Sequence, residues 1–371
     1  MKMIVEPDDG VAPLLAAIKS AKKSVEIAIF RFDRKDIEAA LKAAADRGVR
    51  VTTLIAFSNR GGEQVLRKLE SRCLDAGIIV ARTANDLIRY HGKYILIDRR
   101  VLFMLSFNFT HLDIDRSRGF GIMTTHANWV REAVKLFRAD CTRTKYAPQS
   151  ETFVVSPANA RGVLGKFVKM AKKELLIYDP KISDKEMLHI LQECTHAGVK
   201  IKVIGSVAGS APFEVQQLAG ILLHTRTIIR DRSRAFVGSQ SLRTAELDAR
   251  REVGLIIQDA KLVAKLVDTF ETDWAASCAP KVEAATVSAK EAEKAVQVLT
   301  EELDPLAVSV KKAVRIAVAK AGDDVLHDKD VKDTMKNVVK KAVKEAVKEA
   351  VQDAQDAQDG KDAKAVKSTA N

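Results

Sequence analysis

Two short stretches of the chain combine an imidazole with a cationic side chain two residues further on. In the first, His91 is followed by Lys93, and in the second, His224 is followed by Arg226. Residues two apart on an extended strand leave the same face of that strand, about 7 Å apart. An imidazole can attack an electrophile or transfer a proton, and a neighbouring cation can hold charged oxygens. Each stretch is therefore suited to an anionic substrate.

The two stretches share further spacing. Each cation is followed at the same distance by an aspartate, Asp98 or Asp231, and each histidine is followed at the same distance by a serine, Ser106 or Ser239. Asn108 lies just beyond the first serine and adds an amide donor that the second copy lacks. These agreements predict an internal duplication of the chain.

The elements around the stretches follow an α/β order. Apolar alternation predicts strands, helical periodicity predicts the helices between them, and two apolar runs around the charged turn at Asp98 predict a β-hairpin. In chain order we expect a helix over 11–23, a strand over 24–30, a helix over 36–47, a strand over 49–56, a helix over 62–76, a strand over 78–81, hairpin strands over 94–97 and 101–105, and a helix over 130–137. This order favours a layered α/β domain.

The same pattern restarts after residue 148. Residues 171–178 repeat 21–28 and residues 197–201 repeat 47–51, both at an offset of 150, whereas the histidine stretches are offset by 133. The difference between the two offsets, 17, is the length that the second copy has lost between its second strand and its histidine. We expect two tandem α/β lobes, residues 1–148 and 149–280.

The excess positive charge lies in these lobes. From residue 281 onward the chain has 17 basic and 17 acidic side chains, so residues 1–280 carry the whole formal charge of +12. A field of that sign attracts polyanions and anionic surfaces. Residues 281–371 contain no aromatic side chain and read as a charge-balanced helical or disordered tail, either a solvated appendage or a segment that docks on a partner or a membrane.

The remaining composition predicts a soluble, cytoplasmic protein. Four cysteines are widely spaced without a C-x-x-C pair, which favours a reducing compartment and argues against a metal site. The first residues lack the apolar core of a signal peptide, and no apolar run is long enough to span a membrane. Because one chain holds both histidine stretches, we expect a monomer.

The pattern H-x-K-x4-D, as His91, Lys93 and Asp98 with Ser106 and Asn108 downstream, resembles the signature of the phospholipase D superfamily. A single match to so short a pattern is weak, but two matches on predicted strands, each followed by a serine at the same spacing, are strong. The resemblance covers about residues 10–275. It implies that the two lobes pack about a pseudo-twofold axis and bring both histidines into one phosphate-binding cleft. It also implies that one histidine forms a phosphohistidine while the other protonates the leaving group, and that no cofactor or metal is required.

The second copy departs from the family pattern in one cation. Arg226 stands where the family has lysine, and arginine keeps the charge but is bulkier and forks onto two oxygens. The family often has a glutamate downstream of the serine that orients a histidine. Glu252 fits this position in the second copy, whereas Gly119 occupies it in the first, so that His91 lacks its carboxylate unless Asp113 or Asp115 substitutes.

Several assignments stay open at the level of sequence. Family habit favours His91 as the nucleophile, whereas Glu252 argues that His224 is the better oriented histidine. Asp98 and Asp231 are either catalytic or structural residues of hairpin turns, where aspartate is favoured, and Glu252 is alternatively part of a surface ion pair.

Three functions fit these observations. The first is a metal-independent phosphodiesterase that hydrolyses or transphosphatidylates phospholipids at a membrane surface. The second is a nuclease of the same superfamily, since the charge of +12 would also bind a nucleic-acid backbone. The third is a degenerate phosphate-binding pseudoenzyme, suggested by Arg226 and by the missing first-copy glutamate.

Overall fold

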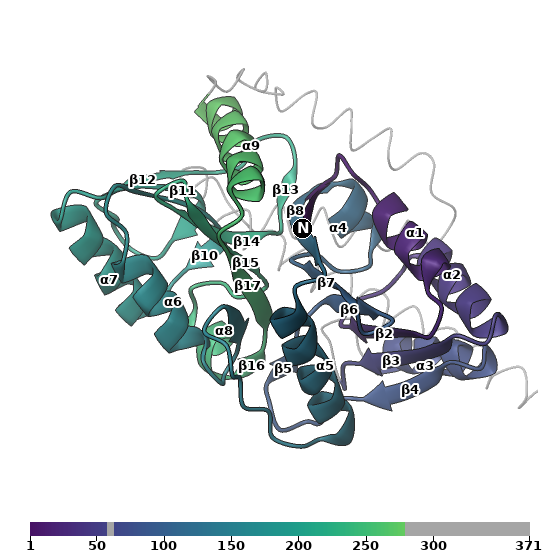
Figure 1. The fold of residues 1–371 in the computed structure, drawn as a ribbon. Helices are drawn as coiled ribbons and strands as arrows, with labels where there is room; N and C mark the ends of the chain where they lie inside the picture. The colour runs from purple at the N-terminus through teal and green to yellow at the C-terminus, as the bar shows by residue number, and fades with distance from the viewer. Residues whose placement is uncertain (58–62, 279–371) are drawn as a thin grey trace, which may run out of the picture. The chain divides into compact units, whose positions relative to one another are not determined.

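The computed structural model describes residues 1–57 and 63–278, and within this part of the chain two mixed sheets form tandem α/β lobes (Figure 1). Residues 1–279 form one compact unit. The tail expected over 281–371, with its two helical stripes, lies outside the described residues.

The first sheet has the order β1-β8-β7-β6-β2-β3-β4, with β13 added beside β8. Strands β2, β3 and β4 are parallel, and the remaining neighbours on this path are antiparallel. Its strands are β1 (Lys2–Glu6), β2 (Ser24–Ile29), β3 (Arg50–Ile55), β4 (Ile79–Arg82), β6 (Tyr94–Ile97), β7 (Val101–Leu105), β8 (Ser117–Thr124) and β13 (Leu222–Leu223).

The second sheet repeats this plan. Its order, β9-β17-β15-β14-β10-β11-β12, places each strand where its counterpart lies in the first sheet. The strands are β9 (Phe153–Val155), β10 (Glu174–Ile182), β11 (Lys200–Val207), β12 (Glu214–Gln216), β14 (Arg226–Arg230), β15 (Arg234–Gly238) and β17 (Val253–Ile257). A third, two-stranded sheet joins β5 (Arg89–Tyr90) of the first lobe to β16 (Arg250–Arg251) of the second.

The helices also correspond, with one exception. The first lobe has α1 (Ala12–Ser20), α2 (Lys35–Asp46), α3 (Glu63–Asp75), α4 (His111–Asp115) and α5 (Ala127–Thr142), and the second has α6 (Ala160–Lys169), α7 (Lys185–His196), α8 (Thr244–Asp248) and α9 (Ala260–Cys278). Among the described residues α3 has no counterpart, because only a short connection joins β11 to β12. The segment that the second copy was expected to lack therefore corresponds to this helix.

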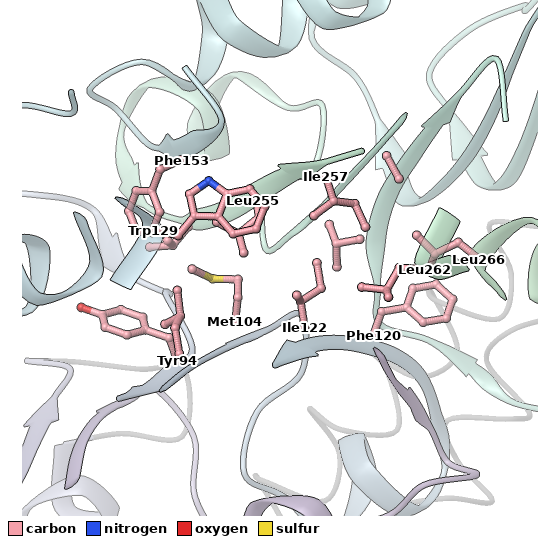
Figure 2. Packing of buried hydrophobic residues seen from close by; sticks show 14 of the residues in the cluster. Tyr94, Met104, Phe120, Ile122, Trp129, Phe153, Leu255, Ile257, Leu262 and Leu266 are labelled. Atoms are coloured by element: carbon pink, nitrogen blue, oxygen red, sulfur yellow. The ribbon is translucent and has the colours of Figure 1, made fainter. Parts of the chain in front are cut away.

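A shared hydrophobic core joins the two sheets. Figure 2 shows Tyr94, Met104 and Ile122 of the first sheet facing Trp129 of α5 and Leu255 of the second sheet. Helices α5 and α9 add their apolar faces to this core, while α1 to α3 cover the outer face of the first sheet and α6 and α7 that of the second. Because the apolar side chains of this core are buried only when both lobes are in contact, close packing fixes the position of one lobe relative to the other.

The sequence did not predict several strands of the two sheets, among them β1, β8 and β9. Strands β1 and β9 are short, and β8 contains Gly119 and Gly121, which normally weaken a strand. Here both glycines are required by close packing, since a Cβ atom at either position would lie 2.8 Å from a side chain of β7 or of the segment after it. Close approach of the backbone, rather than a turn, accounts for these glycines.

Candidate active site

Each candidate histidine lies on a segment that crosses from its own lobe to the other. The N–H of His91 donates to the carbonyl of Arg251 (2.7 Å), and the N–H of His224 donates to the carbonyl of Arg118 (3.2 Å). Both bonds follow the short strand pairs β5–β16 and β13–β8, which connect the lobes. The site is therefore assembled at the junction of the two lobes. The sequence placed His91 on a strand, but it lies in the connection between β5 and β6.

Two buried ion pairs hold these crossing points. The guanidinium of Arg251 binds Asp140 of α5 (3.1 Å), and that of Arg118 binds Asp273 of α9 (2.9 Å). Both pairs join one lobe to the other, and their members are related by the same offset, 133, as the histidines. Sequence reasoning missed them, although the shared offset was available as a signal. Breaking such a pair would leave one charge buried without a partner.

The carboxylate expected to orient a histidine serves the opposite lobe. Oε2 of Glu252 lies 2.8 Å from Nδ1 of His91, and the Glu252 side chain is fully buried. The inference that Glu252 orients His224, and that His91 lacks a carboxylate, was therefore wrong. Spacing along the chain pairs Glu252 with the histidine of its own copy, whereas the crossing strands exchange the partners.

His224 is held differently. Its Nδ1 lies 3.0 Å from the carbonyl oxygen of Ser106, and its Nε2 lies 3.4 Å from Oδ2 of Asp113 and 3.5 Å from Nδ2 of Asn108. The sequence suggested Asp113 as a partner for His91, but this carboxylate contacts His224. Asp115, the other candidate, pairs with Arg34.

Gly119 explains why His224 has no glutamate. Gly119 has the same place in the first lobe that Glu252 has in the second, and a Cβ atom on Gly119 would lie 2.8 Å from the ring of Phe107. The equivalent of Phe107 in the second lobe is Gln240, whose side chain bonds instead to the carbonyl of Val154. An aromatic ring thus fills the space that a second orienting carboxylate would need.

The motif cations lie in equivalent positions. Nζ of Lys93 donates to the carbonyl of His91 (2.7 Å), and Nη1 of Arg226 donates to the carbonyl of His224. Lys93 is fully buried, and Nε of Arg226 is buried without a hydrogen-bond partner among the described residues. Burial lowers the pKa of Lys93 to about 7. Both cations have donor capacity left for an anion.

The electrostatics place both imidazoles in one site. Burial lowers the pKa of His91 and of His224 well below the usual range, and in each case Lys93 and Arg226 both add to the effect. The charge on His91 also lowers the pKa of His224. The two rings therefore share one positive field and are neutral at pH 7, with a lone pair on one nitrogen of each ring.

The structure does not bring the two motif aspartates to the histidines. Asp98 and Arg99 both have positive φ angles of 53°, as a tight hairpin turn requires, and the Asp98 carboxylate accepts backbone N–H bonds of 2.6 to 3.1 Å from Lys22, Lys23 and Ser24. Asp231 makes equivalent bonds of 2.7 to 3.1 Å to residues 172–174. Both therefore pin a hairpin turn to the start of the neighbouring strand, at the end of the hairpin away from the histidine.

The two serines are buried behind the histidines. The hydroxyl of Ser106 accepts the backbone N–H of Phe120 (2.9 Å), and that of Ser239 accepts the N–H of Val253 (3.1 Å). They link neighbouring strands, so that phosphate binding through these hydroxyls stays a prediction. Asn108, by contrast, lies at His224, and its Oδ1 is buried without a partner among the described residues.

Sequence reasoning also missed an aromatic contact on the first histidine. The ring of Phe30 meets that of His91 edge to face, with centroids 4.7 Å apart, and the guanidinium of Arg89 lies 5.4 Å from the Phe30 centroid. Position 30 corresponds to Pro180 in the second lobe. The Phe30 ring thus fixes His91 in a way that has no equivalent at His224.

Two further findings concern metals and membranes. Within residues 1–57 and 63–278, no group of three histidine, cysteine, aspartate or glutamate side chains is arranged to hold a metal ion. In the same part of the chain, every helix is too short or too polar to cross a bilayer.

The duplicated lobes and the paired histidines define a two-lobed phosphodiesterase architecture. The chain belongs to the phospholipase D-like family: the family described as cardiolipin synthase, PLD-like domain, matches residues 14–141 and 164–274. This confirms the superfamily and the tandem lobes that the motifs predicted.

Individual curated proteins and solved structures share less than a third of their residues with this chain over the aligned regions. Mitochondrial cardiolipin hydrolase of Mus musculus is 28% identical over 151 residues, 38% of this chain and 65% of that protein, and its Homo sapiens counterpart is 29% identical over 175 residues, 46% and 64%. The chain thus spans less than two thirds of these curated relatives. Among solved structures, polyphosphate kinase from Porphyromonas gingivalis has a TM-score of 0.61 at 21% identity, covering 74% of this chain and 50% of that one. Phosphatidylserine synthase from Haemophilus influenzae has a TM-score of 0.56 at 11% identity, covering 74% and 85%, and both show a shared fold.

Proposed function

We propose that the protein is a phosphodiesterase that cleaves a phospholipid phosphodiester, by hydrolysis or by transfer to an alcohol, through a phosphohistidine on His91. The observation that carries the proposal is the 2.8 Å contact between Nδ1 of His91 and the buried carboxylate of Glu252. With Nδ1–H donating to this carboxylate, Nε2 keeps its lone pair, and the carboxylate stabilises positive charge that develops on the ring.

The reaction then proceeds in two steps. Nε2 of His91 attacks phosphorus, and the bond from phosphorus to the leaving oxygen breaks as that oxygen takes a proton from Nε2 of His224. Water or an alcohol next gives its proton to His224 and attacks phosphorus, and the N–P bond breaks to restore His91. Lys93 and Arg226 neutralise the non-bridging oxygens in both steps.

A bound phosphodiester also explains how His224 obtains its proton. In the free protein, burial and the two cations keep its pKa low. An anion placed between Lys93 and Arg226 offsets their charge, so that the pKa of His224 rises and the ring can take a proton from solvent. Protonation is thus coupled to substrate binding.

Two observations bear on the substrate. The matched curated relatives are named cardiolipin hydrolases, which supports a phospholipid. The formal charge of +12 favours a nuclease as the second candidate. Because both half-sites belong to one chain, we expect a monomer to be active.

The test separates these functions. The protein is incubated with a chromogenic phosphodiester, with phospholipid vesicles and with single- and double-stranded DNA, and His91→Ala and His224→Ala are assayed in parallel. We expect release of the phospholipid head group, loss of turnover in both variants, and a trapped phosphate on His91. Cleavage of DNA alone would identify a nuclease, and binding of phosphate without turnover of any substrate would identify a pseudoenzyme.

A further inference from the structure

We propose that a rim of exposed aliphatic and basic side chains beside the candidate active site docks the protein on the surface of an anionic phospholipid bilayer. The rim consists of Ile88, Leu112, Leu222, Arg31, Arg89 and Arg116. The proposal rests on the proposed function, since it concerns how a phospholipid in its membrane reaches the histidines.

Each of the two crossing segments carries an aliphatic residue just before its histidine. Ile88 lies three residues before His91 and donates its N–H to the carbonyl of Ala249 (3.0 Å). Leu222 lies two residues before His224 and donates its N–H to the carbonyl of Arg116 (3.3 Å). The two accepting residues, 116 and 249, are related by the offset of 133 that relates the histidines, whereas Ile88 and Leu222 are 134 residues apart. The two segments therefore bond to equivalent carbonyls through aliphatic residues that are shifted by one position.

Both side chains face solvent. Ile88 is 67% exposed and Leu222 is 54% exposed. Isolated exposed aliphatic residues are common on soluble proteins and need no explanation. Here, however, an exposed aliphatic side chain recurs on each of the two crossing segments that carry the histidines. This recurrence indicates a function at the site.

A third aliphatic residue adjoins Leu222. Ser117 pairs with Leu222 in the β13–β8 register, and the Ser117 hydroxyl donates to the carbonyl of Leu112 (2.8 Å). Leu112 is 48% exposed, and the next residue, Asp113, turns inward to His224. The rim thus begins directly beside a side chain that contacts a candidate catalytic histidine.

Basic residues accompany the aliphatic ones. Arg116 is exposed and provides the carbonyl that Leu222 binds, while Arg31 is exposed and Arg89 half-buried, both over the ring of Phe30 that contacts His91. Of the carboxylates on the same segments, Asp115 is paired with Arg34, and Asp86 accepts the hydroxyl of Tyr90.

This composition favours a membrane over a nucleic acid. Aliphatic side chains flanked by arginine enter the interface of a bilayer, where the cations meet anionic head groups. A nucleic acid would satisfy the arginines but offers no apolar phase for three aliphatic side chains. The aliphatic side chains therefore select a bilayer as the partner, and the charge of the arginines selects an anionic one.

Vesicle sedimentation tests the proposal without requiring turnover. The full chain is mixed with vesicles of phosphatidylcholine and phosphatidylglycerol, or of phosphatidylcholine alone, and Ile88→Asp, Leu222→Asp and the double variant are compared with the wild type. We expect the wild type to bind the anionic vesicles, more weakly at high salt, and each substitution to weaken binding about tenfold. Conservative variants Ile88→Leu and Leu222→Ile should retain binding.

Matched controls carry the same charge change elsewhere. Ile79 on β4 and Val65 on α3 are 51% and 55% exposed, so that Ile79→Asp and Val65→Asp should bind as the wild type does. Thermal unfolding of every variant confirms that it is folded. Equal losses in controls and rim variants, full binding by the double variant, or wild-type binding to single-stranded DNA but not to vesicles would each overturn the proposal. Vesicle binding lost only in the rim variants, with no phosphodiesterase activity in the wild type, would uphold the rim and refute the proposed function.

Discussion

Replacement of Glu252 by glutamine tests the assignment of His91 as the nucleophile. The substitution keeps the size of a side chain that is fully buried, and its amide oxygen can still accept the Nδ1–H of His91. What it removes is the negative charge beside the ring. The variant therefore separates orientation of the imidazole from electrostatic stabilisation.

The expected loss follows from the geometry. With Oε2 of Glu252 2.8 Å from Nδ1 of His91, the centres of charge lie about 4 Å apart, and at an effective dielectric constant near 20 their interaction is worth about 4 kcal/mol. That energy bears on the phosphohistidine step, where positive charge develops on the ring. We therefore expect formation of the phosphohistidine to slow about 10³-fold.

Single-turnover kinetics with a chromogenic phosphodiester measure this step directly. Saturating enzyme makes the rate independent of product release, and quenched samples report the phosphohistidine. The phosphate should map to His91 in the wild type and accumulate slowly, at the same residue, in Glu252→Gln.

A matched control removes a buried carboxylate elsewhere. Glu132 is 4% exposed and accepts hydrogen bonds from Tyr146 and from the backbone of Gln149, so that Glu132→Gln should alter stability and leave the rate per folded molecule unchanged. Glu252→Gln with a rate within about tenfold of the wild type, or a phosphate trapped on His224, would refute the reasoning.

Three further outcomes are expected. Asp98→Ala should lower the free energy of unfolding by about 2 kcal/mol in urea titrations, because three backbone N–H groups lose their acceptor. The turnover rate per folded molecule should stay unchanged. A loss of rate without a loss of stability would indicate that Asp98 acts in the active site. Burial raises the pKa of the Glu6 carboxyl from about 4.5 to about 8. Between these two pH values the folded state holds a proton that the unfolded state has released, so the free energy of unfolding should fall as the pH rises from about 4.5 to about 8. This dependence on pH should be absent in Glu6→Gln. Inorganic phosphate should bind with net uptake of protons at pH 8, because the anion raises the pKa of Lys93 from about 7 and also raises the lowered pKa of His224. Calorimetry in buffers of different ionisation enthalpy that shows no uptake would contradict this coupling.

Much of the fold followed from periodicity. The hairpin strands over 94–97 and 101–105 coincide with β6 and β7, and α1, α2, α3 and the parallel strands of the first lobe lie within a few residues of the expected bounds. Helix α5 extends beyond the expected 130–137 at both ends, and α4 was not predicted. The predicted elements carry strong local signals, since each has a regular apolar face. Strand β8 carries no such signal, because its glycines serve contacts with β1 and β7 that are distant in sequence.

The candidate site was predictable in its residue types but not in its pairing. The repeat identified both histidines and the family resemblance pointed to the glutamate, yet neither says which lobe a side chain faces. Only the crossing strands show that Glu252 serves His91 and that Asp113 serves His224. For Asp98 the motif was misleading in another way. Its place in the motif suggested a catalytic role, whereas its hydrogen bonds to backbone N–H groups show that it stabilises a hairpin turn.

The ring of Phe107 makes the inequality of the two half-sites hard to reverse. A glutamate introduced at position 119 would collide with this ring, and replacing the ring by a small side chain would open a cavity in a fully buried core, at a cost of about 3 to 5 kcal/mol. No single substitution therefore makes the two half-sites equivalent. The packing keeps a carboxylate at Nδ1 of His91 and a backbone carbonyl at Nδ1 of His224.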